Sequence, residues 1–141
     1  MFDRENAGCT IEENGKILTI YRTNRNHLET PGGGIEVGES LETAALRETK
    51  EEIGIDVELG NYLGYIDFET AGKRIRSHHF AAKIPKGKIP FVAEPQLFNA
   101  IVWVPLYEWE KFPCSPNTKK FCENYCVTGK LELPNVRERR I

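Results

Sequence analysis

Three consecutive glycines, Gly32–Gly34, stand immediately before a segment that has the pattern of an α-helix. Because glycine has no side chain, this stretch is expected to interrupt regular structure and to let backbone amides and carbonyls face a ligand directly. Ser40 is a favoured N-cap residue and Gly54 is favoured just after a helix, so a helix is predicted from Ser40 to about Ile53. The chain therefore joins an open backbone segment to the start of a helix.

The predicted helix carries a cluster of acids. At about 100° per residue, Glu48, Glu51 and Glu52 share one arc, whereas Thr49 and Ile53 fall on a separate stripe that is expected to face the core. Two interpretations are open: a solvated acidic face, or a site for a hard divalent cation such as Mg²⁺ or Mn²⁺, which prefers carboxylate oxygens. The neighbouring glycines favour the cation site. A Walker phosphate-binding loop is excluded, because no Gly-Lys-Ser/Thr follows the glycines.

This stretch resembles the Nudix box, a pattern of spaced Gly, Glu, Arg-Glu, Glu-Glu and Gly residues. All seven fixed positions are present, and the final aliphatic position is Ile55. One position departs from the pattern, because Thr49 stands where an aliphatic residue is usual. The fixed positions are filled by Gly33, Glu39, Arg47, Glu48, Glu51, Glu52 and Gly54.

The resemblance implies a single Nudix domain over residues 1–141, with a core at about 6–128 and a C-terminal tail at about 129–141. This tail ends in the charged residues 137–140 and is expected to be frayed. The fold of the domain is expected to be α+β, an α/β/α sandwich with a mixed central sheet flanked by helices. The rest of the sequence agrees, because the predicted strands do not alternate regularly with helices. We expect strands at 6–13, 17–22, 27–31, 57–69, 74–84 and 99–104, and further helices at 106–111 and 118–127. Turns at Asn14-Gly15 and Ala71-Gly72 are expected to join two pairs of these strands into hairpins.

The resemblance also implies roles for the box residues. Arg47 is expected to hold the glutamates in place, and the backbones of Gly33 and Gly34 are expected to face the substrate. The base that takes a proton from water is expected among the acids of the site. The candidate ligands for Mg²⁺ or Mn²⁺ are Glu48, Glu51, Glu52, Glu39 and the carbonyl of Gly32.

Other candidates lie outside the box. Glu94 stands where family members recruit a further glutamate, so the catalytic base is one of Glu48, Glu52 or Glu94; an ordinary surface acid is the alternative for Glu94. Arg22 ends a predicted strand where a phosphate-contacting arginine is common in the family. Arg76 belongs to a basic cluster with Lys73 and Arg74. This cluster either contacts the substrate or lies on a solvent-exposed turn. The adjacent His78 and His79 are expected to point to opposite faces of their strand.

The implied activity is hydrolysis of a nucleoside diphosphate linked to another moiety, by metal-assisted attack of water on phosphorus. A MutT-like nucleoside triphosphate or a small nucleotide sugar is the expected substrate. ADP-ribose hydrolases usually carry a proline after the box, and none occurs between Ile55 and Pro85; the tyrosine typical of dinucleoside-polyphosphate hydrolases is replaced by Ala71-Gly72-Lys73. Those two substrate classes remain alternatives. So does a Nudix-fold nucleotide-binding or sensor module without turnover, although the intact glutamates favour an enzyme.

The charge balance gives no sign of a nucleic-acid or membrane partner, because 19 Lys+Arg oppose 21 Asp+Glu for a formal net charge of −2. The charged N-terminus shows no secretory signal, so the expected compartment is the cytoplasm. The four cysteines are expected to be reduced and structural rather than zinc ligands. The expected partner is a small nucleotide, and the family resemblance makes a homodimer possible.

Overall fold

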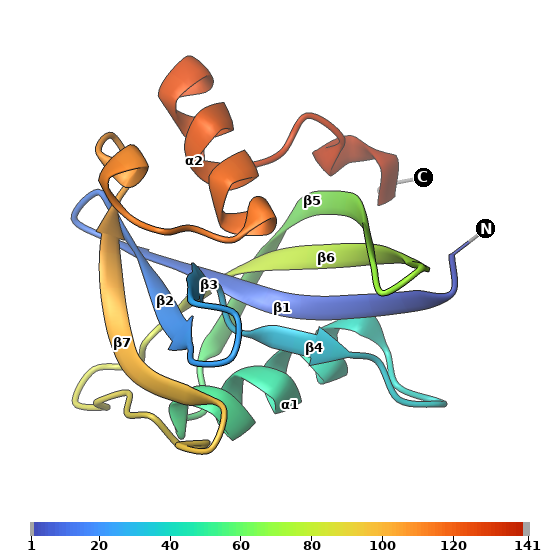
Figure 1. The fold of residues 1–141 in the computed structure, drawn as a ribbon, viewed down its shortest axis with the longest axis horizontal. Coiled ribbons are helices and arrows are strands. Elements are labelled where there is room, and N and C mark those ends of the chain that lie inside the picture. The colour runs from blue at the N-terminus through green and yellow to red at the C-terminus, as the bar shows by residue number, and fades with distance from the viewer. Residues whose placement is uncertain (1, 140–141) are drawn as a thin grey trace.

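The computed structural model describes residues 2–139, which form a mixed sheet with a helix on each face (Figure 1). The expected α+β sandwich is confirmed. The helices are α1 (Leu41–Ile53) and α2 (Pro116–Thr128), with short 3-10 helices η1 (Trp109–Lys111) and η2 (Val136–Arg139). The strands are β1 (Arg4–Glu13), β2 (Lys16–Arg22), β3 (His27–Glu29), β4 (Gly32–Gly34), β5 (Glu58–Thr70), β6 (Lys73–Lys83) and β7 (Phe98–Pro105).

The strand β1 is the centre of the sheet. It pairs antiparallel with β2 and β4 and parallel with β6, and β5 then pairs antiparallel with β6. The other end of the sheet consists of β3 and β7, which both pair with β2. The predicted turn between β1 and β2 has φ angles of 52° at Asn14 and 77° at Gly15, as a tight hairpin with two left-handed residues requires. The sheet is thus mixed, because β1 has both antiparallel and parallel neighbours.

The prediction that Gly32–Gly34 would interrupt regular structure is wrong. These residues form β4, in which Gly32 lies opposite Gly8 of β1. The two backbones approach so closely that a Cβ added to Gly8 would overlap the carbonyl oxygen of Pro31. The missing side chains therefore allow the pairing, because neither strand could accept a Cβ at this crossing.

The helix α1 has the predicted limits. The Ser40 hydroxyl accepts a hydrogen bond from the backbone N–H of Thr43, and Gly54 adopts a left-handed conformation with φ 76° and donates its N–H to the carbonyl of Lys50. Its buried residues Ala44, Ala45 and Ile53 pack into a cluster that also contains Cys9 of β1 and Phe80 of β6. The small alanines bring the helix close to the sheet.

The helix α2 covers the opposite face of the sheet (Figure 1). Its Phe121 packs with Leu63 and Ile66 of β5, and its Cys122 packs with residues of β2, β3 and β7. The helix predicted at 106–111 is wrong, because only Trp109–Lys111 forms a single 3-10 turn there. The sheet is therefore buried on both faces, and the start of α2 is held above it.

The prediction of a frayed tail is wrong for residues 129–139. Leu133 and Val136 are buried, and Asn135 bonds to both the N–H and the carbonyl of Tyr65 on β5. Arg139 then pairs with Glu42 of α1 at 2.9 Å. The tail therefore runs over the edge of β5 and joins the two helical layers. Residues 140–141 lie outside the described part of the chain.

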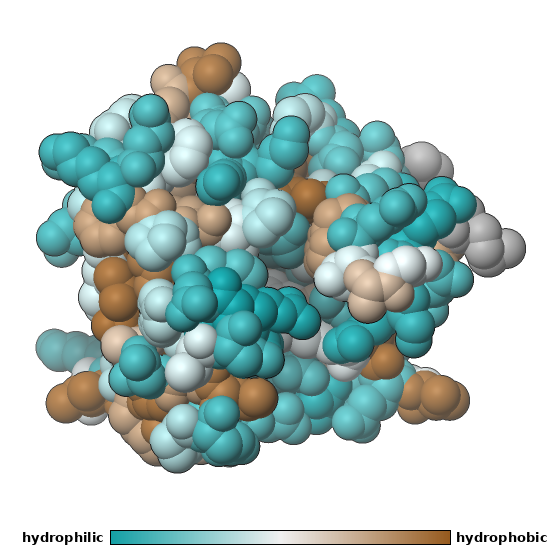
Figure 2. Space-filling view, in the orientation of Figure 1, coloured by the Kyte–Doolittle hydropathy of each residue, from teal (hydrophilic) through white to brown (hydrophobic). Residues whose placement is uncertain are grey.

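The surface is mostly hydrophilic on the face seen in Figure 2, with hydrophobic side chains gathered over β7 and the loop before it. Ile89 and Phe91 of that loop are exposed. All four cysteines are free thiols, and all but Cys126 are buried. Within residues 2–139, neither α-helix combines the length and the apolar character needed to cross a membrane.

Candidate active site

The strand β4 lies directly against the acidic residues of α1. Gly33 leaves room for Glu48, because a Cβ built on Gly33 would lie 2.5 Å from the Cδ atom of Glu48. The backbone N–H of Gly32 donates to Oε1 of Glu52 at 2.7 Å. Two glutamates of the helix are therefore positioned by a strand that has no side chains of its own.

Arg47 joins α1 to the loop before it. Its Nε and Nη2 donate to the two carboxylate oxygens of Glu39 at 2.7 and 2.8 Å, and Nη2 also donates to the Gly34 carbonyl at 3.0 Å. Its Nη1 donates to Glu48 at 3.0 Å and to Glu51 at 3.3 Å. The bonds from Arg47 lower the pKa of Glu39 to about 2, so Glu39 is ionised at neutral pH. Arg47 thus braces the loop and two of the box glutamates together.

The three clustered glutamates differ in exposure. Glu52 is 4% exposed, whereas the side chains of Glu48 and Glu51 are 17% and 47% exposed. The expected separation between the acids and the buried stripe therefore fails at Glu52, which is buried like its neighbour Ile53. The cause is tertiary, because β4 covers this side of the helix and bonds to the Glu52 carboxylate.

Burial and mutual repulsion shape the charges of this cluster. Burial raises the pKa of Glu48 and raises that of Glu52 well above its ordinary value. The negative charge of Glu94 acts on both in the same direction, and that of Glu29 acts on Glu52. Hydrogen bonds from Arg47 and from the Gly32 N–H oppose the shift. A divalent cation would favour the ionised forms, because it attracts every carboxylate in the cluster.

Glu94 reaches the cluster from the loop between β6 and β7. The backbone N–H groups of Phe91 and Ala93 donate to the carbonyls of Ile53 and Glu52 at 3.0 Å each. These carbonyls lie at the end of α1, where no further helical turn can use them. The loop is thereby fixed to the helix end, and the next residue, Glu94, is half-buried beside the acids. A segment far from the box in sequence thus joins the site.

The oxygen-rich donor set suits Mg²⁺ or Mn²⁺. Among residues 2–139, no three His, Cys, Asp or Glu side chains already surround a point where a metal ion could sit. Glu48 and Glu52 are engaged by Arg47 and by the Gly32 N–H, so their carboxylates would have to turn to enclose an ion. Both oxygens of Glu39 are bonded to Arg47, which makes Glu39 a brace in this arrangement.

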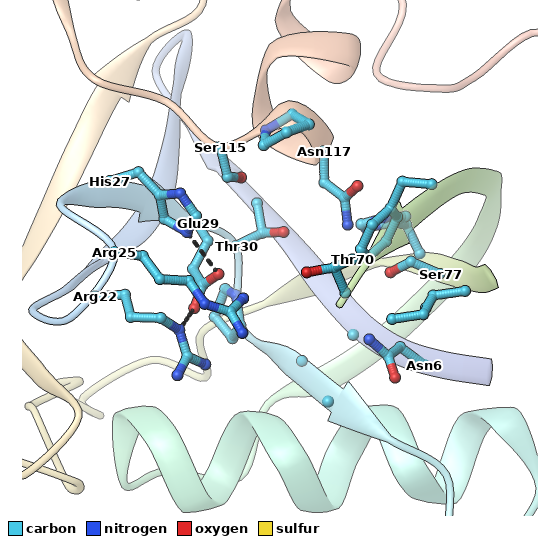
Figure 3. Close-up of a pocket in the computed structure, with 18 of the residues that line it drawn as sticks. Asn6, Arg22, Arg25, His27, Glu29, Thr30, Thr70, Ser77, Ser115 and Asn117 are labelled. Carbon is cyan, nitrogen blue, oxygen red and sulfur yellow. Dashed lines mark hydrogen bonds and ion pairs between the residues drawn. The ribbon is translucent and has the colours of Figure 1, made fainter. Parts of the chain in front are cut away.

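A cavity of about 570 Å³ lies on the other face of the sheet, beneath the start of α2 (Figure 3). Gly32 and Gly33 line it, so β4 borders both the cavity and the acids. Figure 3 shows two chemically different ends of this cavity. One end gathers the charged or ionisable Arg22, Arg25, His27 and Glu29, and the other gathers the polar Asn6, Thr70, Ser77 and Asn117. Arg4 also lines the cavity and donates to Asn6 at 2.9 Å.

Arg22 lines the charged end of the cavity. Its Nε donates to the carboxylate of Glu29, and its guanidinium lies 4.8 Å from the ring centroid of Phe98. His27 contacts the other carboxylate oxygen of Glu29 at 3.1 Å. Glu29 therefore contacts both Arg22 and His27 of the cavity. Its negative charge also raises the pKa of Glu52.

Arg76 does not line the cavity. It lies on the opposite face of β6, where it pairs with Asp67 at 2.9 Å and its guanidinium lies 3.7 Å from the Tyr65 ring centroid. Residues alternate along a strand, and Ser77 and His79 occupy the cavity-facing positions. The structure therefore does not support the expected substrate contact of Arg76.

Glu29 and Asn117 line the cavity but are not predicted as site residues from the sequence. Glu29 stands in a three-residue strand, and Asn117 follows a Ser-Pro pair at the start of α2. Ser115-Pro116 is a recognisable helix-start signal. That signal locates the start of the helix but does not reveal which part of the sheet the helix start faces.

Comparison with known proteins agrees with this geometry. The NUDIX domain matches residues 3–125. A CTP pyrophosphohydrolase of Escherichia coli (strain K12) is 29% identical over 116 residues, which cover 79% of this chain and 83% of that protein. A MutT-like protein of Streptomyces ambofaciens is 39% identical over 66 residues, covering 47% of this chain and only 43% of that protein.

The similarity extends to solved structures. The crystal structure of a MutT NUDIX hydrolase from Burkholderia pseudomallei has a TM-score of 0.77 and 30% identity, covering 85% of this chain and 95% of that one. The fold, the glycine strand against α1 and the domain match over residues 3–125 all agree with the box identified in the sequence. The chain belongs to the NUDIX family.

Proposed function

We propose that this protein hydrolyses a phosphoanhydride bond of a nucleoside diphosphate linked to another moiety, with a nucleoside triphosphate or a small nucleotide sugar as substrate. One observation carries the proposal: Gly32 and Gly33 line the cavity and also contact Glu52 and Glu48. A molecule held in the cavity would therefore lie next to the clustered carboxylates. Similarity to a CTP pyrophosphohydrolase and a MutT-like protein supports the same reaction.

Within the box, the glutamates would bind the metal ion and Arg47 would position them. Glu48, Glu51 and Glu52 would hold Mg²⁺ or Mn²⁺, with the Gly32 carbonyl as a backbone ligand. When bound, the ion would neutralise phosphate charge and lower the pKa of a water that it coordinates. Arg47 keeps Glu48 and Glu51 in place through its hydrogen bonds.

Proton transfer falls to one of the carboxylates Glu48, Glu52 or Glu94. Burial raises the pKa of Glu48 and Glu52, which makes each a stronger proton acceptor once it is ionised. The base takes a proton from the attacking water, and the phosphate leaving group departs in line. The half-buried Glu94 lies beside both and is the candidate that does not belong to the helix.

The charged end of the cavity would receive phosphate groups. Arg22 lines this end, and the exposed Arg25 lies there too. Arg22 is paired with Glu29, so a bound phosphate would compete with that carboxylate for the guanidinium. The substrate would then extend from the acids into the cavity, with its uncharged part towards Asn117.

The test is hydrolysis of a nucleotide panel with Mg²⁺ by the wild type and by Glu52→Gln. The panel holds nucleoside triphosphates, nucleotide sugars, ADP-ribose and dinucleoside polyphosphates, with products identified by mass. Gln keeps the oxygen that accepts the Gly32 N–H but removes the charge. We expect turnover of the first two classes and a loss of at least a hundredfold in Glu52→Gln. Glu123→Gln, on the exposed side of α2, is the matched control and should behave as wild type.

Two outcomes contradict the proposal. Near wild-type turnover by Glu52→Gln would show that the clustered glutamates do not hold the catalytic ion. Binding of a nucleotide by the metal-loaded wild type without any turnover would identify a binding or sensor module instead.

A further inference from the structure

We propose that His79, by a turn of its ring towards the cavity that it lines, recognises the polar edge of the substrate base and is a specificity-determining residue. The inference rests on the proposed function, because it assigns a role to one part of the same cavity. It concerns substrate selection and adds no step to the chemistry at the acids.

His79 lies on the face of β6 that borders the cavity. His79 and Ser77 both line the cavity, as expected for alternate residues of one strand. The neighbouring His78 lies on the opposite face, where its Nδ1 is 2.7 Å from the hydroxyl of Tyr62 and its Nε2 is 3.6 Å from Glu5. The two adjacent histidines therefore have different surroundings, and only His79 faces the cavity.

Both ring nitrogens of His79 are buried without a hydrogen-bond partner in the described part of the chain. The residue is 2% exposed. Buried polar atoms are normally paired, because an unpaired one loses its bonds to water without compensation. The ring packs edge-on against Phe121 at 4.7 Å between centroids, a contact that a phenylalanine could make equally well. Packing alone therefore does not explain a histidine at this position.

The charge state of His79 points to the base rather than to phosphate. Burial lowers the pKa of His79 to about 3, with a smaller contribution from His78, so the ring is neutral at pH 7. A neutral imidazole offers one N–H donor and one nitrogen acceptor. Either nitrogen can bond to a group on the edge of a heterocyclic base, which carries both donors and acceptors, whereas phosphate oxygens need donors alone.

The surroundings of His79 agree with this assignment. Ser77, on the same face of β6, lies at the end of the cavity where Asn117 enters from the start of α2 (Figure 3). The amide and the hydroxyl can each donate and accept. Arg22 and Arg25 lie at the other end. A nucleotide lying along the cavity would thus place its phosphates near Arg22 and its base near Ser77 and His79.

The experiment compares base selection in wild type, His79→Phe and His79→Gln. The probes are the four common ribonucleoside triphosphates, with inorganic tripolyphosphate as a probe without a base. His79→Phe keeps the contact with Phe121 and removes both polar atoms, whereas Gln restores a donor and an acceptor. His78→Phe is the matched control on the opposite face of the same strand. Circular dichroism and the melting temperature check the fold of each variant.

We expect the wild type to rank the four bases by kcat/KM. His79→Phe should lose at least fivefold on the preferred base, mainly through KM, and should flatten the ranking. Its activity on tripolyphosphate should be unchanged, and its melting temperature should equal or exceed that of wild type. His79→Gln should keep part of the ranking, and His78→Phe should keep all of it.

An unchanged ranking in His79→Phe would overturn the inference while leaving the proposed function intact. If the wild type hydrolyses none of the probes, a nucleoside triphosphate is excluded as the substrate of the proposed function, and calorimetric binding of the four nucleoside monophosphates decides on His79 separately. Base-selective binding that His79→Phe abolishes would support the role of His79, and binding that does not distinguish the bases would overturn it.

Discussion

The carboxylate of Glu48 rests against the α-carbon of Gly33. A Cβ on Gly33 would lie 2.5 Å from both the Cδ and the Oε2 atoms of Glu48, closer than real Cβ contacts. Glycine at this position thus provides the space in which the carboxylate sits. The glycine and the glutamate of the box are therefore one structural unit, although fourteen residues separate them in the sequence.

Gly33→Ala should reduce activity far more than stability. The added methyl group must push the Glu48 carboxylate aside, and small displacements of a catalytic group cost large factors in rate. We expect kcat to fall by about a hundredfold. Steady-state kinetics and a melting curve measure the two effects. Gly60→Ala, on β5 and outside the site, should lose some stability but keep its kcat; equal kinetics for the two variants would contradict this account of Gly33.

Arg47→Lys should impair both the site and the fold. A lysine has a compact ammonium group and cannot reproduce the paired bonds from Nε and Nη2 to Glu39 while also reaching Gly34 and Glu48. We expect kcat to fall by at least tenfold and the melting temperature by several degrees. A lysine variant with unchanged kinetics would show that the charge, and not the geometry, of Arg47 matters.

Acid should destabilise the wild type through His79. Its pKa is about 3 in the folded protein, because the ring is buried, against about 6.5 in an unfolded chain. Between these values the unfolded state binds a proton that the folded state rejects, so stability is full above pH 6.5 and falls as the pH drops. Relative to His79→Phe, the free energy of unfolding should fall by about 1.4 kcal/mol per pH unit below 6.5. Urea unfolding at pH 7, 6 and 5 measures it, and parallel curves for the two proteins would refute it.

Asn135→Ala should loosen the tail. The Asn135 amide accepts from the Tyr65 N–H at 3.0 Å and donates to the Tyr65 carbonyl at 2.9 Å, in the manner of a neighbouring strand. Losing both bonds should lower the free energy of unfolding by about 2 kcal/mol. Asn135→Asp keeps the acceptor but sets a carboxylate beside the Tyr65 carbonyl, so it should also be destabilised. Limited proteolysis after residue 130 should quicken in both variants; unchanged cleavage would mean that Leu133 alone secures the tail.

Local signals predicted much of the framework. The caps at Ser40 and Gly54 fix α1, and the turns at Asn14-Gly15 and Ala71-Gly72 fix two hairpins, because each depends on the conformational preferences of a few adjacent residues. The run of glycines at Gly32–Gly34 led to a wrong prediction, because these residues form a strand. Glycine lowers the tendency of an isolated segment to form a strand, but its partner strand β1 decides the outcome.

The candidate site was only partly predictable. The spacing of the box identified the glutamates and Arg47, since helical periodicity places them near one another. It did not reveal that Glu52 is buried, because burial depends on the strand that covers the helix. Glu94 was suggested by resemblance, and its proximity to the acids depends on backbone bonds between the loop and the end of α1.

Local preferences along the chain account for the limits of α1, the alternation of side chains along β6 and the cluster of acids on α1. The packing of the whole domain sets which face of β6 borders the cavity, so that His79 and Ser77 line it while Arg76 and His78 do not. The physical reason is that alternation sets which residues share a face of a strand. The side on which α1 and α2 bury their apolar surfaces then decides what each face meets.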